Sequence, residues 1–149
     1  MRAVLQRVSR ASVTVHEQVV GEIGTGLVVL VGVEQGDGPA DVTYLASKIA
    51  DARVFPDDNG RMNRSVQEVG GRVLVVSQFT LLGDLRKGRR PAFDAAERPD
   101  AARETYESLI SQLKNMGIPI EAGVFQADMR VELINEGPVT VLLDSRRLF

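Results

Sequence analysis

The longest apolar run of the chain is Leu27-Val28-Val29-Leu30-Val31-Gly32-Val33. It is continuous and rich in β-branched residues, a pattern typical of a strand that is buried on both faces. The run is far too short to span a bilayer, so we expect no membrane segment here. The residues on either side of it predict the rest of the fold.

Towards the N-terminus the sequence predicts further strands. Residues 1–9 alternate loosely between apolar and polar types, and the strands predicted over 11–15 and 19–23 flank a short turn. The only histidine, His16, lies near this turn, where we expect a solvated side chain. A Ser-His-Asp triad would have to use His16, and a two-histidine metal site is impossible.

Towards the C-terminus the sequence predicts two helices. Pro39 suits the first position of the first helix, whose apolar residues recur at helical spacing: Val42, Leu45, Ala46, Ile49 and Ala50. A second helix follows the polar loop 83–98 and is expected to stop at Gly117. Its apolar face comprises Ala102, Tyr106, Leu109, Ile110, Leu113 and Met116.

The remaining apolar segments predict strands. They are Val54-Phe55, Val73 to Leu82, Ile120 to Phe125, Met129 to Ile134 and Val139 to Leu143. Together the elements favour an α+β fold, with a mixed sheet or barrel and two main helices. A length of 149 residues fits a single domain over 1–149.

Composition excludes several classes of site. The absence of cysteine removes disulfides, thiolate nucleophiles and cysteine-based zinc sites. The acidic loop 57–63 lacks the alternating ligands and closing glutamate of a calcium loop, so we expect no metal. The N-terminus does not read as a signal peptide, and we expect a cytoplasmic location. The net charge of -2 means that a nucleic-acid partner would need a local basic patch.

Two short motifs each allow two interpretations. Ser77-Gln78-Phe79-Thr80-Leu81 places polar groups at the end of an apolar strand, where they either form a pocket rim or are satisfied by the backbone. Asn135-Glu136-Gly137-Pro138-Val139-Thr140 reads as a turn between two strands, or as the site of a cis peptide before Pro138.

A basic cluster lies in the loop that follows the first motif. Its members are Arg86, Lys87, Arg89 and Arg90. On an acidic protein such a cluster is either a solvated loop or a patch that binds phosphates.

Taken together, these segments resemble the D-aminoacyl-tRNA deacylase family over nearly the whole chain. The resemblance includes Gln6-Arg7-Val8, residues 21–33, Phe55 to Asn63, Lys87 to Pro91 and Ala127-Asp128-Met129. Ser-Gln-Phe-Thr at 77–80 and Gly-Pro-Val-Thr at 137–140 are specific as a pair. Two positions depart from the family pattern, which usually has glycine at Gln126 and serine at Ala92.

The resemblance implies a homodimer that hydrolyses D-aminoacyl-tRNA without a cofactor. It implies that the peptide between Gly137 and Pro138 is cis, and that its carbonyls enter the partner's pocket and hold the substrate amino group. An L side chain would then collide with backbone, whereas a D side chain or glycine would not. The basic cluster would contact the tRNA.

The resemblance also implies that the 2′-hydroxyl of the terminal ribose assists ester cleavage. Thr80 is the one competing nucleophile, but no base is evident near it in the sequence. We therefore assign Ser77, Gln78, Phe79 and Thr80 to positioning the substrate and to backbone oxyanion contacts.

Three rival interpretations remain. The first is a sister deacylase with a trans Gly-Pro peptide that accepts some L-aminoacyl-tRNAs. The second is a non-catalytic nucleic-acid-binding module. A vertebrate relative of the family is linked to DNA unwinding elements and has an extra C-terminal tail, which we do not expect here because this sequence ends at Phe149, soon after Thr140. The third is a structural dimer with no activity.

Overall fold

Strand β3 (Gly26–Gly32) runs through the middle of a mixed six-stranded sheet in the computed structural model, which describes residues 1–149. The strand order is β2-β1-β3-β6-β7, and β8 pairs with β1. The strands are β1 (Arg2–Val15), β2 (Gln18–Ile23), β6 (Arg72–Ser77), β7 (Ile120–Ala122) and β8 (Arg130–Asp144). A separate two-stranded sheet contains β4 (Phe55–Pro56) and β5 (Met62–Arg64). The predicted α+β class with a barrel-like sheet is confirmed.

Alternate residues of β3 enter two different cores, as the continuous apolar run predicted. Leu27, Val29 and Val31 join a cluster of 21 buried residues that lies under the helices. Val28 points to the other face, into a cluster of 7 buried residues that includes Val13 and Leu74. The strand is therefore buried on both faces because side chains of a strand alternate in direction.

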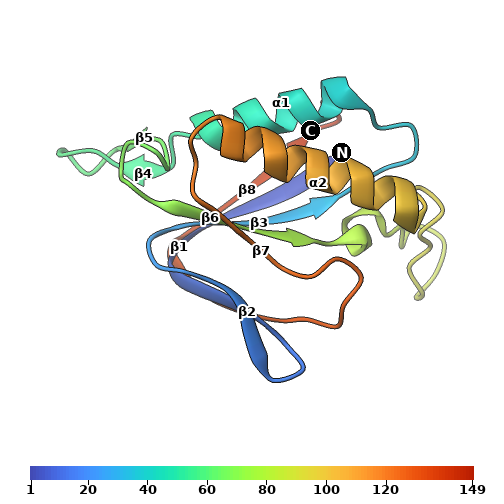
Figure 1. Ribbon diagram of the computed structural model, residues 1–149. Coiled ribbons are helices and arrows are strands. Elements are labelled where there is room, and N and C mark those ends of the chain that lie inside the picture. Colours follow the sequence, from blue (N-terminus) through green and yellow to red (C-terminus); the bar gives the residue numbers. More distant parts are fainter.

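Two helices cover one face of the sheet and pack against each other (Figure 1). Helix α1 (Pro39–Asp51) begins with proline, and the Gly38 N–H donates to the Asp41 carboxylate at 2.8 Å. Its five predicted core residues are all buried. Helix α2 (Pro99–Asn115) ends before Gly117, whose φ of 85° needs glycine. Neither helix combines the length and the apolar character that crossing a bilayer would require.

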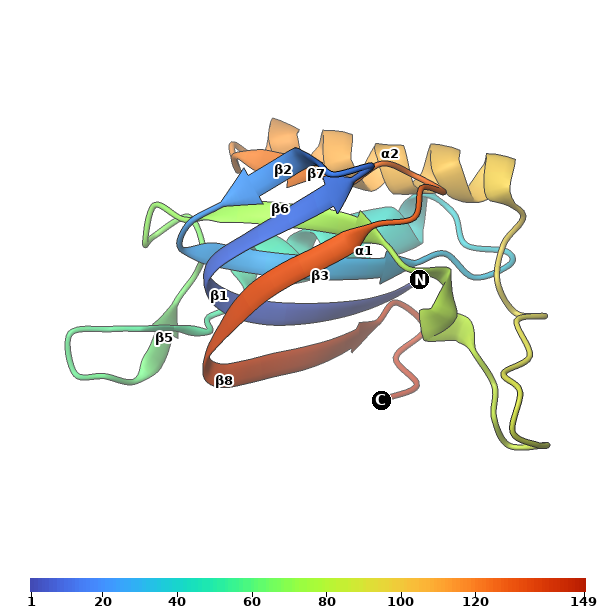
Figure 2. The same cartoon turned by 90° about the horizontal axis from the view of Figure 1, so that it is seen from below.

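Strands β1 and β8 are longer than predicted. Each was expected as two strands, but each is continuous, and the two run side by side and bend back together (Figure 2). The predicted turn in the second motif is wrong. Gln6 pairs with Thr140 and Val8 with Asn135, so residues 136–139 form a bulge in β8 opposite Arg7 alone. Pairing of both halves of β8 with β1 keeps the strand continuous.

Two predicted strands are shorter than expected. The strand predicted over 73–82 ends at Ser77 and is followed by a 3-10 helix, η1 (Phe79–Leu82). An apolar run does not by itself distinguish a strand from a helical turn, and here Leu82 is buried while Phe79 is exposed. The strand predicted to reach Phe125 ends at Ala122, because residues 124–127 form a turn. The hairpin turn at His16 is present, with a φ of 47° at this residue.

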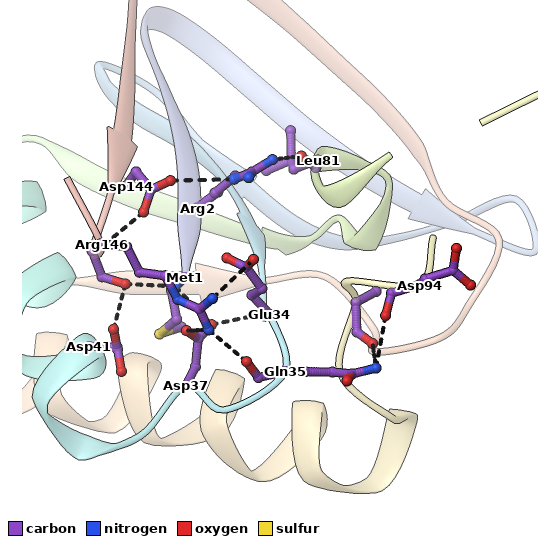
Figure 3. Close-up of polar contacts among 12 residues, drawn as sticks. Met1, Arg2, Glu34, Gln35, Asp37, Asp41, Leu81, Asp94, Asp144 and Arg146 are labelled. Carbon is purple, nitrogen blue, oxygen red and sulfur yellow. Dashed lines mark hydrogen bonds and ion pairs between the residues drawn. The ribbon is translucent and has the colours of Figure 1, made fainter. Parts of the chain in front are cut away.

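Buried polar contacts tie the two chain ends together (Figure 3). The Met1 ammonium lies 2.8 Å from the Asp37 carboxylate and donates to Ser145 Oγ at 2.7 Å. Ser145 Oγ in turn donates to Asp41 at 2.6 Å, in the first turn of α1. These contacts fix the end of β8 against the start of α1.

Candidate functional site

A cavity of about 590 Å³ lies at the carboxyl ends of the parallel strands β3 and β6, beside the start of α2. Its lining is mostly apolar and comes from segments far apart in the sequence: Val31, Val33, Phe79, Phe93, Ala96, Pro99, Ala102, Tyr106, Phe125, Ala127 and Met129. The polar groups around it are Ser77, Gln78, Glu97, Arg98 and Gln126. An apolar cavity with a few convergent polar groups is typical of a small-ligand site.

Part of the first motif lines this cavity. Ser77 is the last residue of β6, and the Gln78 N–H donates to the Val31 carbonyl of β3 at 2.7 Å. Phe79 lines the cavity and meets Phe93 edge to face, with ring centroids 5.0 Å apart. Thr80 lies outside the lining. The motif therefore forms one wall of the cavity, with the Thr80 side chain exposed beside it.

The Thr80 hydroxyl makes one side-chain hydrogen bond. It accepts a hydrogen bond from the Gln78 side-chain amide, a group that does not take up a proton. His16 does not line the cavity. The hydrogen bond that Thr80 makes is therefore to an amide and not to a base.

Arg2 contacts the backbone of the first motif (Figure 3). Its guanidinium donates to the Leu81 carbonyl of η1 at 3.2 Å and lies 3.4 Å from the Asp144 carboxylate. Asp144 is the one polar residue among the buried residues. The start of β1 and the end of β8 therefore fix where η1 lies.

Tyr106 of α2 also lines the cavity. Its hydroxyl donates to the Val75 carbonyl at 3.0 Å, and its ring lies 5.7 Å from that of Phe125. Burial, followed by the negative charge of Glu107, raises the pKa of the Tyr106 phenol. The phenol therefore stays neutral at physiological pH and acts as a fixed hydrogen-bond donor.

We expect Tyr106→Phe to lower stability at neutral pH by about 1 kcal/mol, since one buried hydrogen bond is lost. The unfolded phenol ionises near pH 10 while the folded one stays protonated, so wild-type stability should fall as pH rises above about 10. That fall should be shallower in the variant, by about 1.4 kcal/mol per pH unit. Urea unfolding at pH 8 and at pH 11 measures both effects. Equal alkaline slopes in the two proteins would contradict the assignment.

The loop after η1 carries the basic cluster on a hairpin. Asp84 and Ala92 exchange backbone hydrogen bonds of 2.8 and 2.9 Å, which leaves residues 86–90 exposed at the tip. Arg86 bonds the Asp84 carboxylate, with a shortest distance of 2.6 Å, and lowers the pKa of Asp84 to about 2. Lys87, Arg89 and Arg90 form no ion pair, so three of the four cations are free to meet an anion.

The second motif lies on the bulge of β8 and is exposed. The Gly137–Pro138 peptide is cis, as the resemblance implied. Arg7 holds this bulge: its Nε donates to the Glu136 carbonyl at 3.0 Å and its Nη1 to the Val54 carbonyl at 2.6 Å. The Asn135 side chain accepts from the Val139 N–H at 2.9 Å. Neither Gly137 nor Pro138 lines the cavity of its own chain.

Sequence reasoning missed the residues that hold the two motifs. Arg2 and Arg7 lie on β1, yet their partners are 79 and 129 residues away in the chain. Nothing in a single sequence marks such pairs. The one signal in the sequence was the presence of cationic side chains on a strand whose Ala3, Leu5 and Val8 enter the core.

The sequence of this chain is similar to those of known proteins of one family. A profile of the D-Tyr-tRNA(Tyr) deacylase family matches residues 4–144. The chain is 60% identical to the D-aminoacyl-tRNA deacylase of Desulforudis audaxviator (strain MP104C) and 58% identical to that of Koribacter versatilis (strain Ellin345). Both alignments cover 100% of this chain and 100% of the relative.

Two solved structures have the same fold. One is a c-Myc DNA unwinding element binding protein, with a TM-score of 0.92 and 39% identity over 97% of this chain and 98% of that one. The other is a probable eukaryotic D-amino acid tRNA deacylase, with a TM-score of 0.79 and 18% identity over 95% and 97% of the two chains. The chain therefore belongs to the D-Tyr-tRNA(Tyr) deacylase family, whose members are hydrolases that act on aminoacyl-tRNA.

Proposed function

We propose that this protein hydrolyses the ester bond of D-aminoacyl-tRNA and releases the free D-amino acid and tRNA. The observation that carries the proposal is the full-length identity of 58% to 60% with D-aminoacyl-tRNA deacylases. The cavity fits this chemistry, since a lining rich in apolar and aromatic groups suits the terminal nucleoside and its acyl group. Glycine mischarged on tRNA has no side chain to exclude, so glycyl-tRNA is a further substrate in this proposal.

The chiral filter in this proposal is the exposed Gly137-Pro138 segment of a second subunit. Within one chain this segment bulges out beside Arg7 of β1. The neighbouring Gln6 pairs with Val28 of β3, whereas the part of β3 that lines the cavity is Val31. An exposed backbone held rigid by Arg7, away from its own cavity, is suited to entering the cavity of a partner. The proposal therefore includes a homodimer with two shared sites.

Catalysis in this proposal uses the substrate's own 2′-hydroxyl. The cavity offers Ser77 and Gln78 for positioning, but its one buried ionisable group, Tyr106, stays protonated. A hydroxyl that arrives with the substrate needs only to be oriented, and orientation is what a fixed wall supplies. Because the substrate is tRNA in translation, we place the protein in the cytoplasm.

The direct test is a paired assay with D-tyrosyl-tRNA and L-tyrosyl-tRNA, followed with glycyl-tRNA. We expect rapid release of D-tyrosine and glycine and no release of L-tyrosine above the spontaneous rate. Equal rates on the two enantiomers would favour a deacylase without chiral selection. If none of the three substrates is hydrolysed, the proposed deacylase activity is wrong.

The basic cluster should make tRNA binding depend on salt. Replacing Arg89 and Arg90 together with alanine should flatten the slope of log affinity against log salt by about 1 to 2, since each neutralised phosphate contributes about 0.7 to 0.9. Arg86→Ala is the matched control and should change the slope less, because Asp84 already engages Arg86. Filter binding between low and physiological salt measures the slopes. Unchanged slopes in the double variant would assign the loop to solvent.

A second candidate function is DNA binding, which the name of one structural neighbour states for that protein. The same basic hairpin would serve it. Competition separates the two: duplex DNA in excess should leave hydrolysis of D-tyrosyl-tRNA unchanged under the first proposal and should displace tRNA under the second.

A further inference from the structure

Gln126 occupies a backbone conformation that side chains disfavour, at the edge of the cavity. It is the third residue of the turn closed by the Ala127 N–H and the Val124 carbonyl at 3.2 Å, and its φ is 65°. This position of such a turn favours glycine or asparagine. Strained residues persist where the surroundings hold them, and they gather at functional sites.

Three contacts hold the Gln126 turn on helix α2. The Arg103 guanidinium donates to Gln126 Oε1 at 3.2 Å. The same guanidinium lies over the Phe125 ring, 4.9 Å from its centroid. Phe125 in turn packs on Tyr106, which is fixed to β6 through Val75. The turn is thus anchored to the wall of the cavity through stacked and hydrogen-bonded groups.

This anchor joins two sides of the cavity. Phe125, Gln126 and Ala127 line one side, and Pro99, Ala102 and Tyr106 of α2 line the adjoining side. Gln126 and Arg103 are both exposed, so their hydrogen bond lies at the outer edge and closes the gap between the turn and the helix. Without this hydrogen bond, the turn would be held to α2 through Phe125 alone, and this side of the cavity would be less rigid.

We propose that Gln126, tied to Arg103, is a positioning residue that preforms this wall for the aminoacyl-nucleoside end of tRNA. The inference rests on the proposed function and adds to it the residue pair that sets the affinity for the aminoacyl-nucleoside end of tRNA. A wall ordered before binding removes an entropic cost from association and leaves the chemical step alone. The pair should therefore act on KM and on ligand affinity, with kcat unchanged.

The test is a double-mutant cycle on the whole protein, with 3′-(D-tyrosylamino)-3′-deoxyadenosine as a non-hydrolysable probe. Gln126→Gly and Arg103→Ala should each raise the Kd of the probe by about 10-fold, the upper range for ordering one side chain. The double variant should bind no more weakly than Arg103→Ala alone, because Gln126→Gly and Arg103→Ala both remove the Gln126–Arg103 hydrogen bond and Arg103→Ala also removes the contact with Phe125. Calorimetry gives the Kd values. KM for D-tyrosyl-tRNA should rise in parallel at constant kcat.

Gln126→Glu is the matched control. It keeps the length and the backbone strain and replaces a neutral acceptor with a charged one, so its Kd should stay within about twofold of wild type. A merely structural role would instead lower the thermal midpoint of Gln126→Gly without sparing kcat. Additive effects in the cycle, or wild-type affinity of Gln126→Gly, would overturn the inference alone. A wild-type protein that neither binds the probe nor hydrolyses D-tyrosyl-tRNA would overturn the proposed function together with it.

Discussion

Gly137→Ala should lower kcat/KM for D-tyrosyl-tRNA by about 100-fold or more, because misplacement of a substrate-holding group by about 1 Å has effects of this size. Gly137 has a φ of 132°, which L side chains rarely adopt. A Cβ added there would lie 2.9 Å from Arg7 Nη2 and 2.9 Å from Val139 Cγ2. The Arg7 side chain holds the neighbouring Glu136 carbonyl, so the variant disturbs the group that fixes the segment.

The fold should survive this substitution, because the bulge is exposed and lies outside both buried clusters. Gly24→Ala is the matched control: a Cβ at Gly24 meets nothing within 4 Å, and the backbone there is not left-handed. It should keep wild-type activity. Any Gly137 variant that still hydrolyses should gain activity on L-tyrosyl-tRNA, since exclusion of the L side chain is steric. Wild-type rate and chirality in Gly137→Ala would assign discrimination to side chains elsewhere.

Mixing two inactive variants tests whether the segment serves a partner. Ala127→Trp should fill the cavity of the subunit that carries it. Gly137→Ala should distort the segment that enters the cavity of the partner subunit. A mixed dimer then contains one intact site, so reassociated mixtures should recover about a quarter of wild-type activity. A site built within one chain would recover none, and a monomeric mass by light scattering would exclude sharing altogether.

The sequence was enough to predict both helices, the central strand and the faces that these elements bury, but not η1 or β5. The two helices follow the predicted spacing at Leu45 and Leu109, and β3 enters two cores because its apolar run is uninterrupted. Those features depend on the local spacing of apolar residues, which can be read directly from a single sequence. The ends of the elements were harder to predict. Ser77 and Phe79 belong to one apolar run, and only tertiary packing decides where the strand ends.

The second motif marks the limit of local reasoning. Glycine and proline predicted a turn at 137–138, and their local preferences are compatible with one. In the fold β1 pairs with β8 on both sides of these residues, so the segment becomes a bulge and not a reversal. Arg7, which holds the bulge, is 129 residues from the carbonyl it contacts. Pairings over such distances follow from the assembled sheet, and a single sequence carries no periodic trace of them.

The sharpest test of the chemistry compares a missing hydroxyl on the protein with one missing on the substrate. Thr80→Ala should keep measurable turnover, within about 10-fold of wild type, because only one positioning hydrogen bond from Gln78 is lost. D-Tyrosyl-tRNA ending in 2′-deoxyadenosine should react about 100-fold to 10,000-fold more slowly with wild type, the range for removal of an assisting proton-transfer group.

Single-turnover rates with saturating enzyme separate chemistry from binding in this comparison. The deoxy substrate should still compete with normal substrate at an unchanged inhibition constant, since the cavity wall and the basic hairpin meet the same groups in both. Loss of competition would mean that the 2′-hydroxyl binds and does not react. If Thr80→Ala is inactive while the deoxy substrate reacts normally, Thr80 is the nucleophile. The proton of its hydroxyl would then have to leave by a route other than the Gln78 amide, which has no basic lone pair to accept it.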